Sequence, residues 1–136
     1  LNERAAELSP RMSVSDLVGF DYDCSILDIR PSKEYYASYY PGSTWVDISK
    51  GMPTNRISKK KPIVVVGDIQ PDGANYANAL IRAGFKNVSL LDGGIDALRA
   101  DASALLMSGK PETTMQSMQR NVRTRLPTFN LYNNNN

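Results

Sequence analysis

Residues 63–66, a run of four β-branched side chains, constrain the fold more than any other feature of this sequence. The run has no polar alternation, which is typical of a strand covered on both faces in a parallel sheet. It stops at Gly67, and from Gly73 the apolar or small residues follow the spacing of a helix that ends at Gly84. A strand, a loop and a helix in this order predict half of a βαβ unit.

The loop between this strand and this helix lies where an α/β protein gathers its ligands. It consists of Gly67, Asp68, Ile69, Gln70, Pro71 and Asp72. None of these residues offers the nucleophile or the basic group that catalysis or anion binding ordinarily needs, and both charges are negative. We expect Asp72 to cap the helix, and two carboxylates without further ligands make a poor metal site. The loop is therefore predicted to carry no catalytic residue, cofactor or metal.

Length and composition bound the class of protein. With 136 residues the chain fits one small domain, and no apolar run approaches the ~20 residues of a membrane span. Cys24 is the only cysteine, which excludes an internal disulfide, and we expect no signal peptide before the fold. These features predict a cytoplasmic protein that is not integral to a membrane. Because the sequence begins at Leu1 rather than Met, we expect it to be a domain of a longer protein.

The charge is distributed unevenly along the chain. Residues 107–136 hold four basic side chains against one acidic one, so this segment carries +3 and residues 1–106 carry 2 − 3 = −1 of the net charge of +2. A nearly neutral body argues against nucleic acid as the partner. The same segment is poor in large apolar side chains, which predicts disorder. We therefore expect a linker at residues 1–10, a domain at residues 11–106 and a disordered tail at residues 107–136.

The remaining elements are predicted from local patterns. Strands are expected over residues 24–29, 43–48 and 87–91, and helices over residues 12–20, 30–36 and 95–106. Ser13 or Ser15 can cap the first of these helices. The last helix rests on Ile95, Leu98, Ala102 and Leu105, whose spacing places them on one helical face.

Several short motifs along residues 10–106 resemble, in their order, those of the rhodanese-like domain family. They are Asp28-Ile29-Arg30, Glu34-Tyr35, Pro41-Gly42-Ser43, the stretch from Ala83 to Val88, and Leu91-Asp92-Gly93-Gly94-Ile95. The resemblance implies an α/β fold with a central parallel sheet flanked by helices on both faces. It also implies structural roles for Asp28, Arg30, Glu34, Asp92, Gly93 and Gly94.

Active members of that family carry a cysteine directly after the central strand, in a six-residue loop that lowers the thiol pKa and holds a persulfide. Counting back from Ala83-Gly84-Phe85 without a gap places Gly67 on that cysteine. The resemblance therefore implies a pseudoenzyme that acts as a protein-interaction or docking module. A divergent sulfurtransferase that uses Cys24 or a partner's thiol on thiosulfate or a persulfide is the alternative, and a purely structural spacer is a third reading.

A narrower resemblance lies in the loop without cysteine and in residues 90–98. Both are similar to the terminal rhodanese-like domain of the TBC-domain-containing kinase-like proteins, in which a kinase-like domain and a Rab GTPase-activating TBC domain come first. The resemblance implies a place in a larger regulator of Rab GTPases and membrane trafficking. The partner would then be another protein or a neighbouring domain of the same chain.

Four further features have a structural and a functional interpretation. Cys24 is expected to be a small buried hydrophobe rather than a displaced nucleophile. Arg30 is expected to pair with Asp28 or Glu34. The tyrosines at positions 35, 36, 39 and 40 can pack the core or form a binding patch, and residues 59–61 (Lys-Lys-Lys) can be a solvated turn or a site for acidic lipid or protein.

Overall fold

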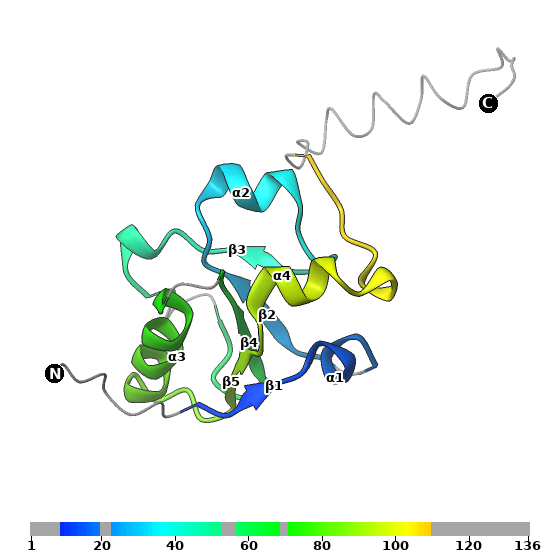
Figure 1. Cartoon of the computed structure of the whole chain (residues 1–136). Helices are drawn as coiled ribbons and strands as arrows, with labels where there is room; N and C mark the ends of the chain where they lie inside the picture. The colour runs from blue at the N-terminus through cyan, green and yellow to red at the C-terminus, as the bar shows by residue number, and fades with distance from the viewer. Residues whose placement is uncertain (1–8, 20–22, 53–56, 69–70, 110–136) are drawn as a thin grey trace, which may run out of the picture.

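A parallel sheet with the strand order β1-β5-β4-β2-β3 lies at the centre of the computed structural model (Figure 1). The model describes residues 9–19, 23–52, 57–68 and 71–109. The strands in this part of the chain are β1 (Arg11–Met12), β2 (Ser25–Asp28), β3 (Thr44–Trp45), β4 (Ile63–Val66) and β5 (Val88–Leu91). Each neighbouring pair of strands is parallel, which confirms the predicted central sheet.

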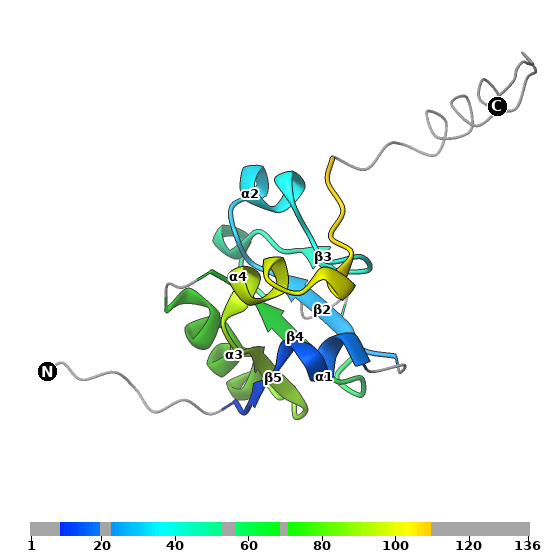
Figure 2. The ribbon, with the colours of Figure 1, turned by 45° about the vertical axis from the view of Figure 1, so that its right-hand side comes forward.

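Helices cover both faces of this sheet. They are α1 (Val14–Gly19), α2 (Ser32–Ala37), α3 (Asp72–Arg82) and α4 (Gly94–Arg99), with 3₁₀ turns η1 (Ile48–Lys50) and η2 (Ala102–Ala104). Figures 1 and 2 show α3 on one side of the sheet, and α1 and α4 on the other. The predicted arrangement of a parallel sheet between helical layers is therefore confirmed.

The central strand β4 contributes to two separate hydrophobic clusters. Ile63 and Val65 pack in one cluster with residues of α3, whereas Val64 and Val66 pack in a second cluster with residues of α1 and α4. Successive side chains of a strand point to opposite faces, so both faces of β4 need apolar side chains. All four residues are almost fully buried, as the unbroken β-branched run predicted.

Ser13 begins α1 as one of the two predicted caps. Its Oγ accepts a hydrogen bond from the backbone N–H of Asp16 at 3.0 Å. Val14 and Leu17 then point into the core from this short helix. The preceding two-residue strand β1 was not predicted, because two residues carry too little periodicity to indicate a strand.

Two elements are shorter than predicted, for the same physical reason. In the expected strand over residues 43–48 the ladder stops after Trp45, and in the expected helix over residues 95–106 the α-helix stops at Arg99. At both places an aspartate, Asp47 or Asp101, accepts hydrogen bonds from the N–H and hydroxyl of the serine two residues later. These local bonds compete with the regular ladder and start a 3₁₀ turn instead. They also lower the pKa of Asp47, through the Ser49 side chain first.

The prediction that Ala102 and Leu105 pack on the same helical face as Ile95 and Leu98 is therefore wrong. Ala102 is exposed and Leu105 has 74% of its surface exposed, so neither residue shares the buried face of Ile95 and Leu98. Leu105 also has a left-handed backbone, with φ at +53°. The chain turns there and runs back toward α2.

Residues 107–109, which the sequence placed in the tail, pair with the segment that follows α2. Met107 and Tyr39 exchange two backbone hydrogen bonds of 2.8 Å, and the N–H of Gly109 donates to the carbonyl of Tyr36 at 2.7 Å. Residues 1–8 and 110–136 lie outside the described residues. The bounds of the predicted linker and tail need correction, because Ser9 is buried, the carbonyl of Pro10 accepts a hydrogen bond from the N–H of Leu90 at 2.9 Å, and residues 107–109 pair with the α2 region. A linker over residues 1–8 and a disordered tail over residues 110–136 stay predictions.

Two truncations test where the folded domain ends. We expect a chain that ends at Gly109 to melt at the same temperature as the 136-residue chain, because the removed residues lack apolar surface to bury. A chain that ends at Leu106 loses the three backbone hydrogen bonds and should melt about 5 °C lower or more. Thermal unfolding followed by circular dichroism measures both values. Equal melting temperatures for the two truncated chains would contradict this assignment.

Candidate functional site

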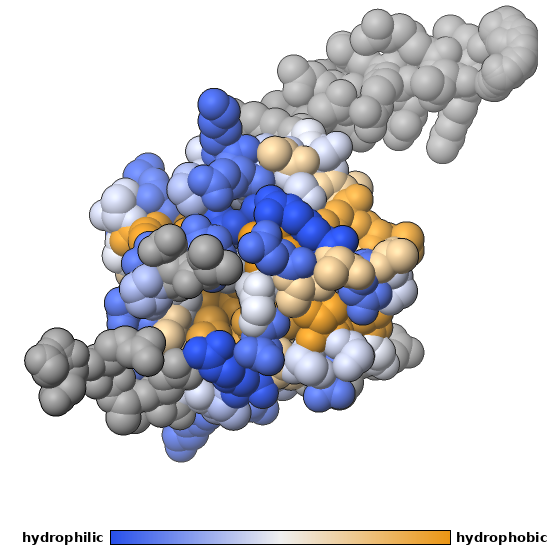
Figure 3. All heavy atoms as spheres, in the orientation of Figure 1, coloured by the Kyte–Doolittle hydropathy of each residue, from blue (hydrophilic) through white to orange (hydrophobic). Residues whose placement is uncertain are grey.

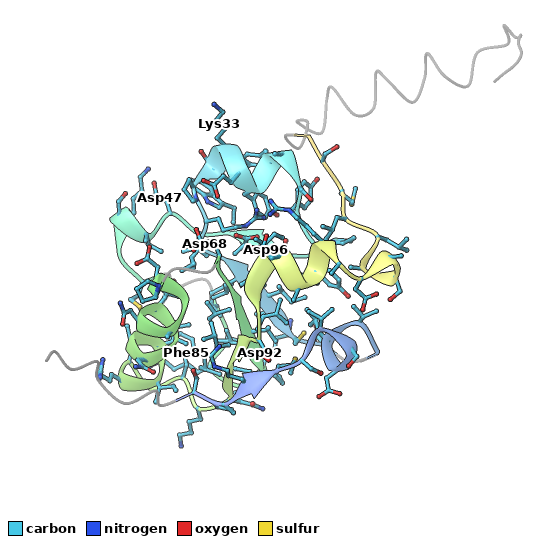
Figure 4. The ribbon with its side chains drawn as sticks, viewed as in Figure 1. Lys33, Asp47, Asp68, Phe85, Asp92 and Asp96 are labelled. Atoms are coloured by element: carbon cyan, nitrogen blue, oxygen red, sulfur yellow. The ribbon has the colours of Figure 1, made fainter. Side chains whose placement is uncertain are left out.

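The candidate site lies at the carboxyl edge of the sheet, where β4 ends at Val66 and the chain crosses to α3. Gly67 is buried, Asp68 is half-buried, and Pro71 and Asp72 are exposed. The predicted loop residues Ile69 and Gln70 lie outside the described residues. Figure 4 shows Asp68 from the loop and Asp96 from α4 in this region, below α2.

The start of α4 is locked against the loop by a close backbone contact. The carbonyl of Gly67 accepts a hydrogen bond from the N–H of Ile95 at 2.9 Å. Gly94 has φ at +58°, and a Cβ at this position would lie only 2.5 Å from the Gly67 carbonyl oxygen. No side chain fits there, so Gly94 allows the two backbone segments to meet.

Gly67, in contrast, has room for a side chain. A Cβ at this position would meet the Gly73 Cα at 3.4 Å and the Ile29 Cδ1 at 3.9 Å, which are ordinary contact distances. Its neighbour Gly73 is more constrained, because a Cβ there would lie 2.9 Å from the Leu90 Cδ1. Packing around the Cβ position therefore does not require a glycine at position 67. The glycine differs from the cysteine of active family members in its chemistry, because it has no thiol.

The prediction that Asp72 caps α3 is wrong. The helix begins at Asp72 itself, Pro71 occupies the capping position, and no side-chain hydrogen bond caps this end. A capping side chain needs an extended backbone, but Pro71 has helical angles of φ −74° and ψ −2°. Asp72 instead lies in the first turn, where its charge still favours the positive end of the helix by about 0.3–1 kcal/mol.

Arg30 and Asp28 form a buried ion pair at the end of β2, which confirms one of the two predicted pairings. The Nη2 of Arg30 lies 2.8 Å from Oδ2 of Asp28, and its Nε donates to Oδ1 at 3.0 Å. The side chains are 0% and 1% exposed. Arg30 also donates to Glu34, but through the backbone carbonyl at 3.2 Å rather than the carboxylate.

The guanidinium joins three elements that the sequence did not connect. Its Nη2 donates to the carbonyl of Ser38 beyond α2 at 2.7 Å. The indole Nε1 of Trp45 on β3 donates to the carbonyl of Arg30 at 2.7 Å. The sequence could not identify these partners, because every residue has a backbone carbonyl, whatever its side chain.

The other residues of the expected structural motif lie at the surface or in a turn. Glu34 is exposed on α2, and Asp92 forms an exposed ion pair with Arg11 at 3.4 Å. Gly93 has φ at +78°, and a Cβ there would lie 2.8 Å from the Cβ of Ala97. A glycine is therefore needed at position 93, in the turn that leads into α4.

Cys24 lies at the opposite edge of the sheet from the loop. It precedes Ser25, which aligns with Ile63 at the amino end of β4, whereas Asp28 aligns with Val66 at the carboxyl end. The thiol is half-buried against the α1 and α4 cluster, as expected for a small hydrophobe. Burial, and then the charge of Asp23, raises the pKa of Cys24.

The tyrosines contribute both to the core and to the surface. Tyr35 is buried, and its hydroxyl donates to the carbonyl of Ser43 at 2.8 Å. Its ring stacks on Tyr39 at 4.7 Å and meets Tyr36 edge-on at 4.9 Å. Tyr36, Tyr39 and Tyr40 are half-buried, so each of these tyrosines packs one part of its side chain and exposes the other. Burial raises the pKa of Tyr35 and of Tyr40.

Metal-binding clusters and membrane-spanning helices are both absent from residues 9–19, 23–52, 57–68 and 71–109, which the structure describes. No group of three or more histidine, cysteine, aspartate or glutamate side chains is placed to hold a metal ion there. No helix within the same residues has the length and apolar character needed to cross a membrane.

A family model for the rhodanese-like domain matches residues 12–101, which is most of the chain. The chain belongs to this family. A TBC domain-containing protein kinase-like protein of Dictyostelium discoideum is 36% identical over 107 residues, covering 77% of this chain and 10% of that protein. A TBC domain-containing protein kinase-like protein of Mus musculus is 26% identical over 133 residues, covering 73% of this chain and 15% of that protein. This rhodanese-like domain therefore spans a small part of the length of these relatives.

Solved structures support the same fold. The crystal structure of the Alr3790 protein from Anabaena sp. superimposes with a TM-score of 0.66 at 21% identity. The match covers 85% of this chain and 94% of that structure. At this level of identity the likeness establishes the rhodanese-like fold alone.

A matched pair of glycine substitutions tests the lock between α4 and the loop. Gly94→Ala adds a Cβ against the Gly67 carbonyl at positive φ, so we expect it to lower the free energy of unfolding by more than 3 kcal/mol. Gly42→Ala also has a positive φ but meets nothing within 4 Å, and should cost about 1–2 kcal/mol. Urea unfolding gives both values, and equal losses would show that the close contact does not matter.

Proposed function

We propose that this rhodanese-like domain is catalytically inactive and acts as a docking module within a larger protein of the TBC domain-containing kinase-like type. The proposal rests on the residue directly after β4, which is Gly67. The family resemblance places the nucleophilic cysteine at this position. Sulfur transfer needs a thiolate at that point to accept and hold the sulfur atom. The loop of residues 67–72 supplies no thiol.

The charge of the loop works against the same chemistry. Asp68 and Asp72 bring two negative charges to a place where thiosulfate, an anion, would have to bind. Negative neighbours also raise the pKa of a thiol and keep it protonated at neutral pH. The loop therefore lacks both the nucleophile and the electrostatic conditions that would activate one.

The alternative function, a divergent sulfurtransferase that uses Cys24, has less support. Cys24 and Gly67 lie at opposite edges of the sheet, about five residues apart in strand register and on the order of 15 Å at the rise of a strand. Burial raises the Cys24 pKa, which lowers its reactivity. The helix starts and backbone amides of the candidate site are therefore not available to it.

Two exposed apolar side chains support a docking role. Leu105 is 74% exposed and Met107 is 51% exposed, in the segment that pairs beside Tyr39. Figure 3 shows apolar side chains gathered on the side where η2 and the following residues lie. The left-handed backbone of Leu105 costs about 1–2 kcal/mol, so the fold holds this exposed side chain at a cost. A contact with another protein surface would cover it.

The larger setting of this module is inferred from the relatives. Both are several times longer than this chain, and their names refer to a TBC domain and to protein kinases. We infer that the module docks onto a neighbouring domain of the same chain or onto a protein partner. The whole protein would regulate Rab GTPases in membrane trafficking, in the cytoplasm.

An assay of thiocyanate formation from thiosulfate and cyanide tests the inactivity. Wild type and Cys24→Ser should both show no turnover above the buffer rate, because neither has a thiol in the loop. A Cβ meets only ordinary contacts at position 67, but Gly67→Cys should remain at least about 100-fold below an active rhodanese assayed in parallel, because Asp68 and Asp72 oppose a thiolate. Turnover in wild type that disappears in Cys24→Ser would establish the alternative function.

Pull-downs with the domain as bait test the docking role. Partners held by wild type should be lost from the double variant Leu105→Ser and Met107→Ser. Ile48→Ser, at a third exposed hydrophobic residue on η1, serves as the matched control and should keep them. Loss in the control as well, or no specific partner for any bait, would favour a structural spacer.

A further inference from the structure

The charged side chains of the described residues divide between the two edges of the parallel sheet. The amino edge, where strands start and α3 ends, carries Lys59, Lys60, Lys61, Arg82 and Lys86. One carboxylate in this region, that of Asp23, pairs with Lys61 at 3.2 Å. The amino edge is therefore strongly positive, although the chain as a whole is nearly neutral.

The five cations come from two segments that lie side by side. The Nζ of Lys59 sits 5.5 Å from the centre of the Phe85 ring, over the turn between α3 and β5. A Cβ on Gly84 in that turn would lie 3.3 Å from the same nitrogen. The N–H of Ile63 donates to the carbonyl of Asn87 at 2.8 Å, which fixes the two segments at the backbone. The sequence places these segments more than 20 residues apart, and the fold makes them one surface.

Acidic residues gather at the opposite edge. Aspartates follow the carboxyl ends of β3, β4 and β5 or open the helices after them, at positions 47, 68, 72, 92 and 96. Two arginines near that edge, Arg11 and Arg99, form ion pairs with Asp92 and Asp96. The domain therefore has a positive end and a negative end along the strand direction. A charged surface within about one Debye length, ~10 Å, would attract one end and repel the other, and so orient the domain.

We propose that the amino edge binds the surface of an anionic lipid bilayer. A bilayer rich in acidic headgroups attracts clustered lysines and repels the acidic edge, so both halves of the asymmetry favour one orientation. This binding is peripheral and needs no membrane-spanning segment. It is separate from the docking role of residues 105–107 and from the empty catalytic loop.

The composition of the amino edge fits a lipid surface better than a protein or nucleic acid. Four of its five cations are lysines, which act as point charges and are depleted at protein interfaces, where arginine and aromatic side chains predominate. Among the described residues the exposed large hydrophobics are Ile48, Leu105 and Met107, and none of them belongs to this edge. A surface of flexible lysines without an apolar anchor suits a diffuse array of headgroups.

Sedimentation with vesicles tests the proposal on the full 136-residue chain. The vesicles contain phosphatidylserine and phosphatidylcholine, and vesicles of phosphatidylcholine alone are the reference. Wild type should bind the anionic vesicles at low salt and be released as the salt concentration rises. Lys59→Glu with Lys60→Glu should weaken the partition coefficient at least about 25-fold, since each neutralised charge is worth about fivefold.

The matched control reverses two exposed lysines at the other edge. Lys33→Glu with Lys50→Glu has the same net charge and the same tail, so it should retain nearly the wild-type partition coefficient. Equal weakening in both double variants would overturn the proposal, because binding would then follow net charge alone. Absence of wild-type binding to anionic vesicles would also overturn it. So would binding to RNA or to a polyglutamate peptide in preference to the vesicles. Circular dichroism of each variant verifies that the fold is retained.

Discussion

The ion pair between Arg30 and Asp28 organises the end of the sheet on which the rest of the structure depends. Both side chains are excluded from water, so removal of either one would leave an uncompensated charge that costs about 3–5 kcal/mol. All three guanidinium nitrogens donate, to Asp28 and to carbonyls of the α2 region. A lysine could not satisfy this fork of acceptors. None of these bonds involves the loop after β4, so this end of the sheet does not need a nucleophile in that loop to keep its structure.

The sheet and its helices were predictable because their signals are local and strong. Four β-branched residues at β4 indicate a buried strand whatever lies elsewhere in the chain, and the serines at positions 13 and 15 indicate a helix start, which Ser13 caps. The predicted elements were wrong where a short-range bond overrode periodicity, as in α4, which ends at Arg99 before the turn formed by Asp101 and Ser103. The pairing of Met107 with Tyr39 joins residues almost 70 positions apart, and nothing in either side chain signals a backbone contact.

The candidate site was predictable in composition but not in detail. The absence of a nucleophile from residues 67–72 follows from the sequence alone, and so does the partnership of Arg30 with an acidic neighbour. The role of Asp72 did not follow, because the backbone angles of Pro71 decide which residue caps α3. The contact between Gly94 and Gly67 brings two distant backbone segments close together. A glycine in the sequence can indicate such a close approach, but it does not identify the segment that it meets.

An NMR titration of the wild-type chain with thiosulfate, followed at the backbone amides of Gly67, Asp68 and Gly73, tests whether the loop after β4 still binds the substrate of an active rhodanese. Sodium chloride at matched ionic strength is the reference. We expect no saturable change at these amides, because residues 67–72 bring two carboxylates and no cationic side chain to the place where the anion would bind. Saturable shifts confined to these amides would contradict this expectation, since they would show that the loop still binds the substrate of an active rhodanese.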